Sequence, residues 1–146
     1  MKKYVICCFF VVNISPTSIS EFSFMLKPSA IEGIGVGVFA THDIEAGTII
    51  DASGIPVRIL HKDEIPLVFL KYCVALGGGF YRCPDCFSKM AIFWYLNHSN
   101  SHNLDWIDTG VFRTNKDIKQ FEELLMNYNQ LDEPENEKEE FYKRLQ

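Results

Sequence analysis

The sequence predicts a mainly β fold with short helices, built as a single domain. Three short runs rich in β-branched residues, at 48–50, 56–60 and 111–113, are typical of short strands, and Gly47 and Gly54 bound the first two of them. The other apolar stretches are also short, so many small elements are indicated rather than long helices. A chain of 146 residues without an internal repeat has the size of one domain with one hydrophobic core.

The remaining elements of the body follow in chain order. A short mixed run at 21–26 and a glycine-rich stretch at 33–37 come first. Segment 65–76 fits either a helix or a pair of strands, because its apolar content does not distinguish them. The run at 91–96 has the composition of a buried segment, and 122–128 is expected to lead from a turn into a final strand.

The two ends of the chain differ in character from the domain, which we expect at 21–129. Residues 1–20 are an N-terminal extension with the layout of a secretory signal, although an extra strand or upstream residues fit as well. Its apolar run of about nine residues is too short to span a bilayer. Residues 130–146 form an acidic tail, which after Pro134 favours a solvated helix. The large apolar side chains of this tail are Phe141, Tyr142 and Leu145.

Composition narrows the functional classes. Fourteen Lys and Arg against 19 Asp and Glu give a net charge of −5, so the chain has no overall basic character for direct nucleic-acid binding. Aromatic residues make up 14% of the chain, which is compatible with an aromatic-lined pocket in an enzyme or a peptide-binding module. The five cysteines are an odd number and include an adjacent pair, so we expect reduced thiols and a cytoplasmic or nuclear protein, with secretion as the alternative.

Three separated stretches carry candidate chemistry, and the first is the glycine-rich stretch at 33–37. Glycines allow a backbone to approach a ligand closely, but this stretch matches neither a phosphate loop nor a dinucleotide fingerprint. A turn between two strands is the alternative.

The third stretch, at 117–128, combines an acidic pair, an apolar run and Tyr128, and also fits a solvated turn before an edge strand.

The second stretch, at 93–103, leads from an apolar run into a polar cluster that begins at Asn97. Asn and Ser bond their own backbone, so the cluster also fits the end of a strand. His98 and His102 are four residues apart, as on a zinc-binding helix, but no Glu follows His98 and the segment has an irregular pattern. A metal site is therefore not favoured.

Four patterns occur in a fixed order along the chain. Residues 35–40 read Gly-X-Gly followed by an apolar residue, Phe and Ala, and residues 44–50 read Ile-X-X-Gly-X-X-Ile. The later matches are Asn97, His98, Ser99 and Asn103 to Asn-His-Ser-X-X-Pro-Asn, and Asp117, Ile118, Glu122, Glu123, Leu124 and Tyr128 to Asp-Ile-X-X-Gly-Glu-Glu-Leu-X-X-Asp-Tyr. Over residues 25–128 the chain thus resembles the SET domain, the fold of protein lysine methyltransferases that use S-adenosylmethionine.

The resemblance implies a fold of small sheets, the β-clip fold. In such a fold the segment 97–103 threads beneath the segment that carries Tyr128, which forms a C-terminal pseudoknot. The backbone of the glycine stretch would hold the methionine part of S-adenosylmethionine, and the Asn-His pair would meet the cofactor near its adenine and amino group. The cofactor-binding residues implied in this way are Gly35, Val36, Gly37, Asn97 and His98.

The resemblance also implies a catalytic residue and a channel for the substrate lysine. Tyr128 would stand at the point of methyl transfer, Trp106 would line the channel, and Tyr142 or Phe141 would close it. Free lysine has a pKa near 10.4, so the channel must help the amine lose its proton, which an apolar aromatic lining does by desolvation. No metal is required. The acidic tail suits a lysine-bearing basic protein or peptide, such as a histone, as the substrate.

Three positions depart from the family's patterns. His102 replaces Pro, which is expected to loosen the segment at 97–103. Phe121 replaces Gly, so the turn before the last strand lacks an easy positive φ, and Asn127 replaces Asp and removes a charge. These changes keep open the alternative of a catalytically weak or inactive SET-like module that binds a peptide.

Cys83 and Cys86 form a Cys-X-X-Cys pair outside these patterns. With Cys73 as a third ligand the pair would fit part of a zinc site, and alone it would fit a redox pair. A second such pair is missing, and no thioredoxin-like unit surrounds it. We therefore expect a turn with buried or unreactive thiols, and a metal or redox module is the third hypothesis.

Overall fold

The computed structural model describes residues 23–143 and confirms the mainly β class with short helices. The strands in that range are β1 (Phe24–Pro28), β2 (Val36–Ala40), β3 (Ile49–Asp51), β4 (Val57–His61), β5 (Val74–Gly77), β6 (Phe80–Pro84), β7 (Asn97–His98), β8 (Leu104–Asp108), β9 (Val111–Thr114) and β10 (Glu123–Met126). The 3₁₀ helices are η1 (Lys62–Glu64), η2 (Leu67–Tyr72), η3 (Ile92–Tyr95) and η4 (Tyr128–Gln130), and the α-helix is α1 (Glu140–Lys143). The predicted extension at 1–20 lies outside the described residues.

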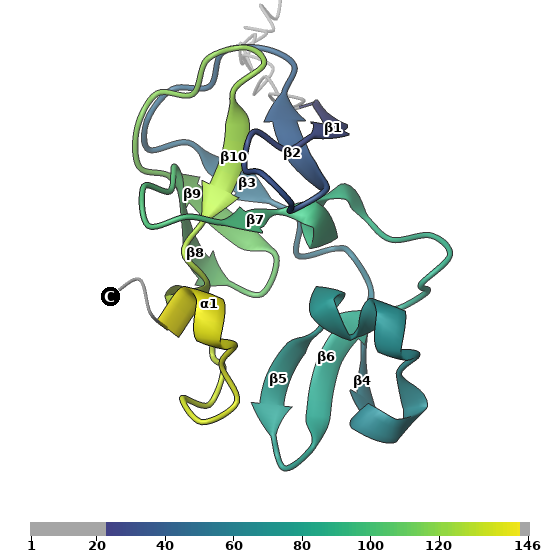
Figure 1. Ribbon diagram of the computed structural model, residues 1–146. Helices are drawn as coiled ribbons and strands as arrows, with labels where there is room; N and C mark the ends of the chain where they lie inside the picture. The colour runs from purple at the N-terminus through teal and green to yellow at the C-terminus, as the bar shows by residue number, and fades with distance from the viewer. Residues whose placement is uncertain (1–22, 144–146) are drawn as a thin grey trace, which may run out of the picture.

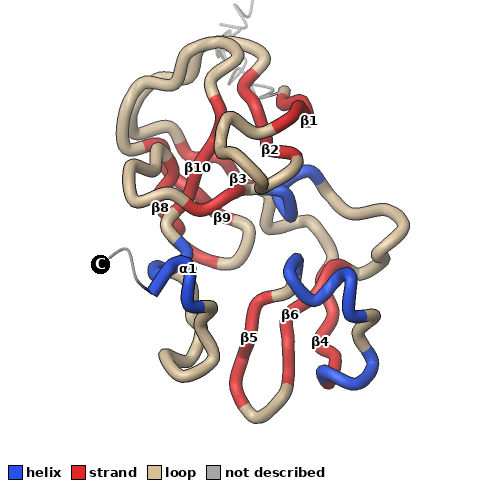
Figure 2. Tube along the Cα trace, in the orientation of Figure 1, coloured by secondary structure: helices blue, strands red, loops and turns tan. Residues whose placement is uncertain are grey.

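The strands form two sheets at opposite ends of the molecule (Figure 1). The larger sheet has the order β1-β2-β10-β8-β9-β3, with β7 paired to β10, and the smaller one has the order β4-β6-β5. The helices are short segments beside and between the sheets (Figure 2). No helix in the described range has both the length and the apolar character that a bilayer crossing requires.

The hydrophobic core lies in the larger sheet. Val38 and Ala40 of β2 are fully buried in this core, and β2 is paired with β1 along one edge and with β10 along the other. The other core residues come from across the chain and are Ile44, Ile50, Leu96, Leu104, Phe112, Ile118, Leu124 and Met126. A well-packed core fixes β2 and β10, whose ends carry the glycine stretch and Tyr128.

Strand β10 brings the second and third motif stretches together. It pairs in parallel with β7, where Leu125 is opposite Asn97, and with β8, where Met126 is opposite Leu104. The buried side chain of Asn103 completes the contact, because its Nδ2 donates to the carbonyl of Glu123 at 2.8 Å and its Oδ1 accepts from the N–H of Leu125 at 2.8 Å. An amide side chain here acts as a strand partner, which explains why Asn suits this position.

Three local expectations need correction. Segment 65–76 is neither a single helix nor a pair of strands, because η2 follows Pro66 and ends before β5 begins. The run at 91–96 is largely a partly exposed 3₁₀ turn in which only Leu96 is buried. The tail is helical only over α1 in the described range, and Tyr142, with 3% of its surface exposed, is packed rather than solvated.

The turn before β10 keeps a left-handed residue although glycine is absent. Phe121 has φ 66° and is 54% exposed, so its side chain gains little from burial while its backbone is strained. We expect Phe121→Gly to be more stable than Phe121→Ala by about 1 kcal/mol, since both remove the ring and only glycine relieves the strain. Urea denaturation of the two variants measures this difference.

The neighbouring residue provides a control with the opposite sign. Gln120 is not among the residues with positive φ, so Gln120→Gly should be less stable than Gln120→Ala by roughly 0.5–1 kcal/mol. If alanine were at least as stable as glycine at position 121, the strain attributed to Phe121 would be wrong.

Candidate functional site

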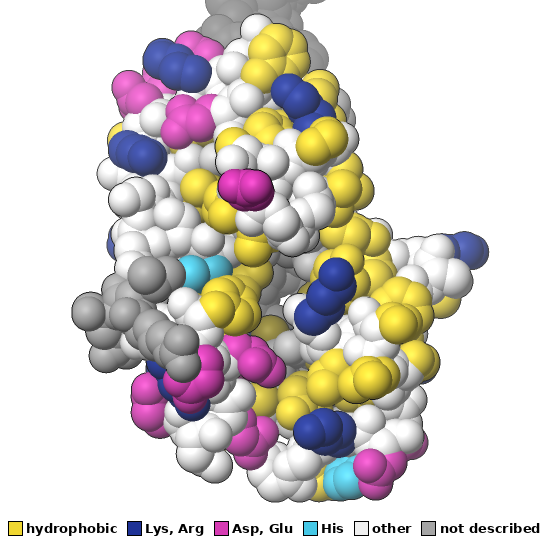
Figure 3. Space-filling model, in the orientation of Figure 1, with side chains coloured by type: hydrophobic (Ala, Val, Ile, Leu, Met, Phe, Trp, Pro, Cys, Tyr) yellow, Lys and Arg dark blue, Asp and Glu magenta, His cyan; other side chains and the backbone are white. Residues whose placement is uncertain are grey.

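A cavity of about 920 Å³ lies between the two sheets and the tail. The space-filling view shows a hollow between the upper and lower parts of the molecule (Figure 3). The cavity brings together most of the site residues expected from the sequence, which are Gly35, Val36, Asn97, His98, Trp106, Tyr128, Phe141 and Tyr142. Gly37 is not part of its wall. This volume is within the range of small-molecule binding sites.

The glycine stretch contributes open backbone to the cavity wall. Gly33 and Gly35 have φ 78° and 99°, and no atom lies within 4 Å of the place where a Cβ would stand. The N–H of Ser29 donates to the carbonyl of Gly35 at 2.9 Å and closes the loop. A ligand can therefore approach this backbone without meeting side chains.

A buried carboxylate, Glu123, holds this loop against the motif at 97–99. Glu123 is 6% exposed and accepts hydrogen bonds from Ser29 Oγ at 2.8 Å, from the N–H of Ala30 at 2.9 Å and from Asn97 Nδ2 at 3.0 Å. Asn97 Nδ2 also donates to the carbonyl of Val36 at 3.0 Å. The side chain of Asn97 thus fixes the cavity wall.

Gly37 stands behind that wall, against the same carboxylate. A Cβ at Gly37 would lie 2.0 Å from Glu123 Oε1 and 3.0 Å from Asn97 Nδ2. The sequence patterns include Glu123 as a match but give it no role. Glu122 and Glu123 are adjacent in the sequence, and the sequence alone does not show which of the two is buried.

His98 lines the cavity and has one ring nitrogen that is buried without a partner among the described residues. Its Nδ1 accepts the N–H of Tyr128 at 3.1 Å, so the proton of the neutral ring is on Nε2, which is buried without a partner. Burial, followed by the nearby His102, lowers the pKa of His98, and the neutral form is therefore favoured. The rings of Tyr128 and Tyr142 lie 5.3 and 5.8 Å from the His98 ring between centroids.

The backbone N–H and the side-chain hydroxyl of Tyr128 are both hydrogen-bonded. Its hydroxyl donates to the carbonyl of Leu96 at 2.6 Å, while its N–H is bound by His98. Burial, and then the negative charge of Glu133, raises the pKa of Tyr128 well above its ordinary value. The hydroxyl therefore stays protonated, and its oxygen keeps lone pairs for a further hydrogen bond.

The tail is tied back over the cavity through Tyr142. Its hydroxyl donates to Glu133 Oε2 at 2.5 Å, and Glu133 Oε1 accepts the N–H of Ala75 in β5 at 3.1 Å. Asn129 Nδ2 also donates to the Tyr142 carbonyl at 3.2 Å. Burial and the Glu133 hydrogen bond raise the pKa of Tyr142. These bonds explain why this segment is packed although its sequence is mostly charged.

Of the three cysteine thiols in the described range, those of Cys73 and Cys83 also interact with each other. Cys73 donates to the carbonyl of Phe69 at 3.5 Å and Cys83 to that of Tyr81 at 3.6 Å, whereas Cys86 is paired with a serine hydroxyl. Between residues 23 and 143, no group of three or more His, Cys, Asp or Glu side chains is arranged to hold a metal ion.

The environments of these thiols predict their reactivity. Hydrogen bonding, first from the Ser88 hydroxyl, lowers the pKa of Cys86, whereas burial raises the pKa of Cys73 and of Cys83. We expect iodoacetamide to modify Cys86 about tenfold or more faster than the other two in the native protein, because the thiolate is the nucleophile. Peptide mapping by mass spectrometry measures this, with a urea-unfolded sample in which the three react alike as the control. Equal native rates would contradict the assignment.

The family model of the SET domain matches residues 35–129. A candidate histone methyltransferase from Plasmodium falciparum is similar in structure at 22% identity, with 72% of this chain and 91% of that chain covered and a TM-score of 0.50. The methyltransferase domain of human PR domain-containing protein 2 is similar at 24% identity, with coverages of 77% and 80% and a TM-score of 0.50.

A humanized mutant of the Chaetomium thermophilum Polycomb Repressive Complex 2 with a bound inhibitor is similar at 22% identity and a TM-score of 0.50. There, 77% of this chain aligns with only 16% of the chain it matches. No curated protein sequence matches the chain. These likenesses agree on the fold, and the match to the family model covers more than half of the sequence. The chain belongs to the SET-domain family.

Proposed function

We propose that this chain is an S-adenosylmethionine-dependent protein-lysine N-methyltransferase that acts on a histone or another basic protein. The observation that carries the proposal is the convergence of the glycine stretch, His98 and Tyr128 on one cavity in a SET-domain chain. The family membership gives the class of chemistry, and the cavity gives the residues that would perform it.

The residues on one side of the cavity fit the cofactor. Gly35 offers open backbone, Asn97 holds the carbonyl of the adjacent Val36, and the unpaired Nε2–H of His98 is a donor that a polar ligand would satisfy. Gly37 would act indirectly, because it gives Glu123 room to hold the wall. S-adenosylmethionine would supply an electrophilic methyl group bound to a positively charged sulfur.

The residues on the other side fit a lysine side chain. Trp106 and Tyr142 line the cavity near Tyr128, and an apolar aromatic lining favours the neutral amine over the ammonium. The Tyr128 hydroxyl donates its hydrogen bond to the carbonyl of Leu96. Its oxygen can therefore accept a hydrogen bond from an N–H of the amine and so orient the nitrogen lone pair. Fixed alignment of this kind contributes roughly 7–11 kcal/mol to lowering the barrier of a two-reactant step.

The acidic tail supports a basic substrate. Glu133, Glu137 and Glu139 line the same cavity as the two tyrosines. Carboxylates beside the entrance to a site attract positively charged partners and increase their rate of association. A lysine within a basic peptide therefore suits this rim better than a lysine within an acidic one.

We also infer that the expected pseudoknot is present. The N–H of Ser99 donates to the carbonyl of Met126 at 3.0 Å, and the N–H of Asn103 donates to that of Leu125 at 3.0 Å. These bonds, with the parallel pairing of β7 and β8 to β10, support a path of the segment 97–103 along the strand that leads to Tyr128.

Methyl transfer from radiolabelled S-adenosylmethionine tests the proposed function. The chain is incubated with histones and with whole-cell protein, and the labelled residue is identified by mass spectrometry. We expect label on lysine. Label on another residue type, or none on any protein, would contradict the assignment to lysine methylation.

The departures at His102, Phe121 and Asn127 favour one alternative, a SET-like module that binds a peptide without turnover. Calorimetry separates the two functions, because the module would bind a lysine-bearing peptide or the cofactor while no label is transferred. Binding together with label on lysine would exclude the alternative.

A further inference from the structure

His102 lies between two hydrogen-bond acceptors. Its Nδ1 is 3.2 Å from the carbonyl oxygen of Asn100, and its Nε2 is 3.1 Å from Oδ1 of Asp105. The same Nε2 is also 3.4 Å from Nε2 of Gln130. A neutral imidazole carries one N–H and satisfies one of these acceptors, whereas the protonated ring satisfies both. The side chains of His102 and Asp105 are 19% and 26% exposed, so the pair is largely shielded from water.

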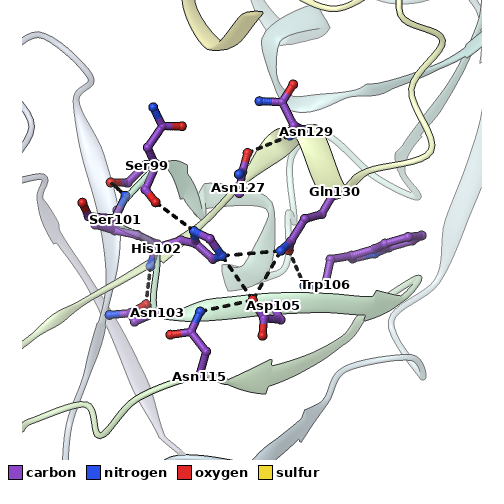
Figure 4. Close-up of polar contacts among 12 residues, drawn as sticks. Ser99, Ser101, His102, Asn103, Asp105, Trp106, Asn115, Asn127, Asn129 and Gln130 are labelled. Atoms are coloured by element: carbon purple, nitrogen blue, oxygen red, sulfur yellow. Dashed lines mark hydrogen bonds and ion pairs between the residues drawn. The ribbon is translucent and has the colours of Figure 1, made fainter. Parts of the chain in front are cut away.

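Asp105 collects a set of donors around this histidine. Its Oδ1 accepts from Asn115 Nδ2 at 3.1 Å and from Gln130 Nε2 at 3.3 Å in addition to the histidine (Figure 4). Burial opposes the charge of Asp105, but these hydrogen bonds outweigh it and lower the pKa of the carboxyl group. Asp105 therefore remains an anion, and a carboxylate is a strong acceptor for the three donors around it.

Gln130 connects the His102–Asp105 pair to the part of the cavity that contains Trp106 and Tyr128. Its Oε1 accepts the N–H of Trp106 at 2.9 Å, which fixes the orientation of the amide and directs Nε2 towards the His102–Asp105 pair (Figure 4). Gln130 is in η4, the same short turn that begins with Tyr128. The network thus joins the loop at 99–103, strand β8 and the turn that carries the Tyr128 hydroxyl.

A different network supports the glycine stretch. That side of the cavity is held by Glu123 and Asn97, whose side chains bond to Ser29, Ala30, Val36 and each other within the described residues rather than to His102, Asp105 or Gln130. The two halves of the site therefore have separate supports. A change at His102 should disturb Tyr128 and Trp106 and leave the glycine side in place.

We propose that His102 is a positioning residue for methyl transfer, which holds the Tyr128 turn against β8 through Asp105 and Gln130. The proposal rests on the proposed function of the cavity. His102 stands where the family's pattern has proline, which has no side-chain donor, so this support belongs to the present chain. The expected loosening of the segment by His102 is thus replaced by an added set of hydrogen bonds.

Two substitutions at His102 separate positioning from general stability. His102→Leu removes both ring nitrogens, whereas His102→Arg supplies N–H donors for both acceptors. We expect kcat for methyl transfer to fall about 10- to 100-fold in the leucine variant, with the Kd for S-adenosylmethionine unchanged within about threefold. The arginine variant should recover most of kcat. His61→Leu, in the smaller sheet, is the matched control and should leave kcat unchanged.

The outcomes that overturn the proposal are specific. An unchanged kcat in His102→Leu, or a parallel loss of kcat and cofactor affinity that arginine does not rescue, would show that His102 does not position Tyr128.

A second readout is independent of turnover. The NMR resonances of the Tyr128 amide and the Gln130 side-chain amide should shift in His102→Leu and return in His102→Arg. If the wild-type chain transfers no methyl group, the proposed function fails, and this readout alone decides whether the network holds the turn.

Discussion

Tyr128→Phe is expected to lower kcat for methyl transfer about 100-fold or more while the chain still binds S-adenosylmethionine. The substitution removes only the hydroxyl, whose oxygen is the acceptor proposed to orient the substrate amine, and loss of such alignment costs on the order of 10²-fold in rate. It also leaves the buried carbonyl of Leu96 without a partner, which costs about 1–3 kcal/mol of stability. Radiolabel transfer at saturating cofactor measures kcat, and thermal unfolding shows that the variant is folded at the assay temperature.

Tyr95→Phe is the matched control for this prediction. Tyr95 also lines the cavity, but among residues 23–143 its hydroxyl has only the sulfur of Met90 as a partner, at 4.0 Å. Its removal should change kcat less than about threefold, because a contact this long is weak. Equal rates for Tyr128→Phe and the wild-type chain would remove Tyr128 from the catalytic role.

Gly37→Ala is expected to destabilise the fold by about 3 kcal/mol or more. The new methyl group would lie 2.0 Å from the carboxylate of Glu123, and it can be accommodated only if that carboxylate moves. Glu123 is buried and accepts three hydrogen bonds that join the glycine loop to Asn97, so its displacement breaks a buried charged network. Urea denaturation gives the free energy of unfolding. The loss would be a large share of the 5–15 kcal/mol typical of a domain.

Gly54→Ala isolates the steric cause of that loss. Gly54 has no atom within 4 Å of its Cβ position and no positive φ, so alanine should be neutral or slightly stabilising there. A Gly37→Ala variant that unfolds with the same free energy as Gly54→Ala would show that Glu123 moves without cost. Its hydrogen bonds would then not be what holds the cavity wall.

The order of short motifs predicted the fold class and most of the cavity wall. Val36, His98 and Tyr128 are far apart in the sequence, and the motif match placed them together because the pairing of β10 with β2 and β7 is a property of the family's fold. Hydrophobic pattern alone could not do this. It does not predict the secondary structure of 65–76. A 3₁₀ helix between Pro66 and Cys73 is followed there by a strand, and the two have similar apolar compositions.

The contacts that depend on one buried polar atom could not be predicted. Nothing in the local sequence distinguishes Glu123, which fixes the glycine loop, from the exposed acidic residues around it. The same holds for Glu133, whose carboxylate joins Tyr142 to β5 and turns an acidic tail into part of the wall. Phe121 was expected to make a positive φ difficult in this turn, yet its φ is 66° and its N–H donates to the carbonyl of Ala40 at 2.8 Å.

Calorimetry tests whether this cavity is a cofactor site. S-adenosylmethionine is titrated into the wild-type chain and into the Gly37→Ala variant. We predict that one cofactor binds per wild-type chain, in a cavity whose wall depends on the glycine stretch and on Asn97 and His98. We also predict that Gly37→Ala, at a temperature where it is still folded, binds at least about tenfold more weakly, which corresponds to 1.4 kcal/mol. Absence of binding to the wild-type chain, or equal affinity in the two proteins, would contradict these predictions.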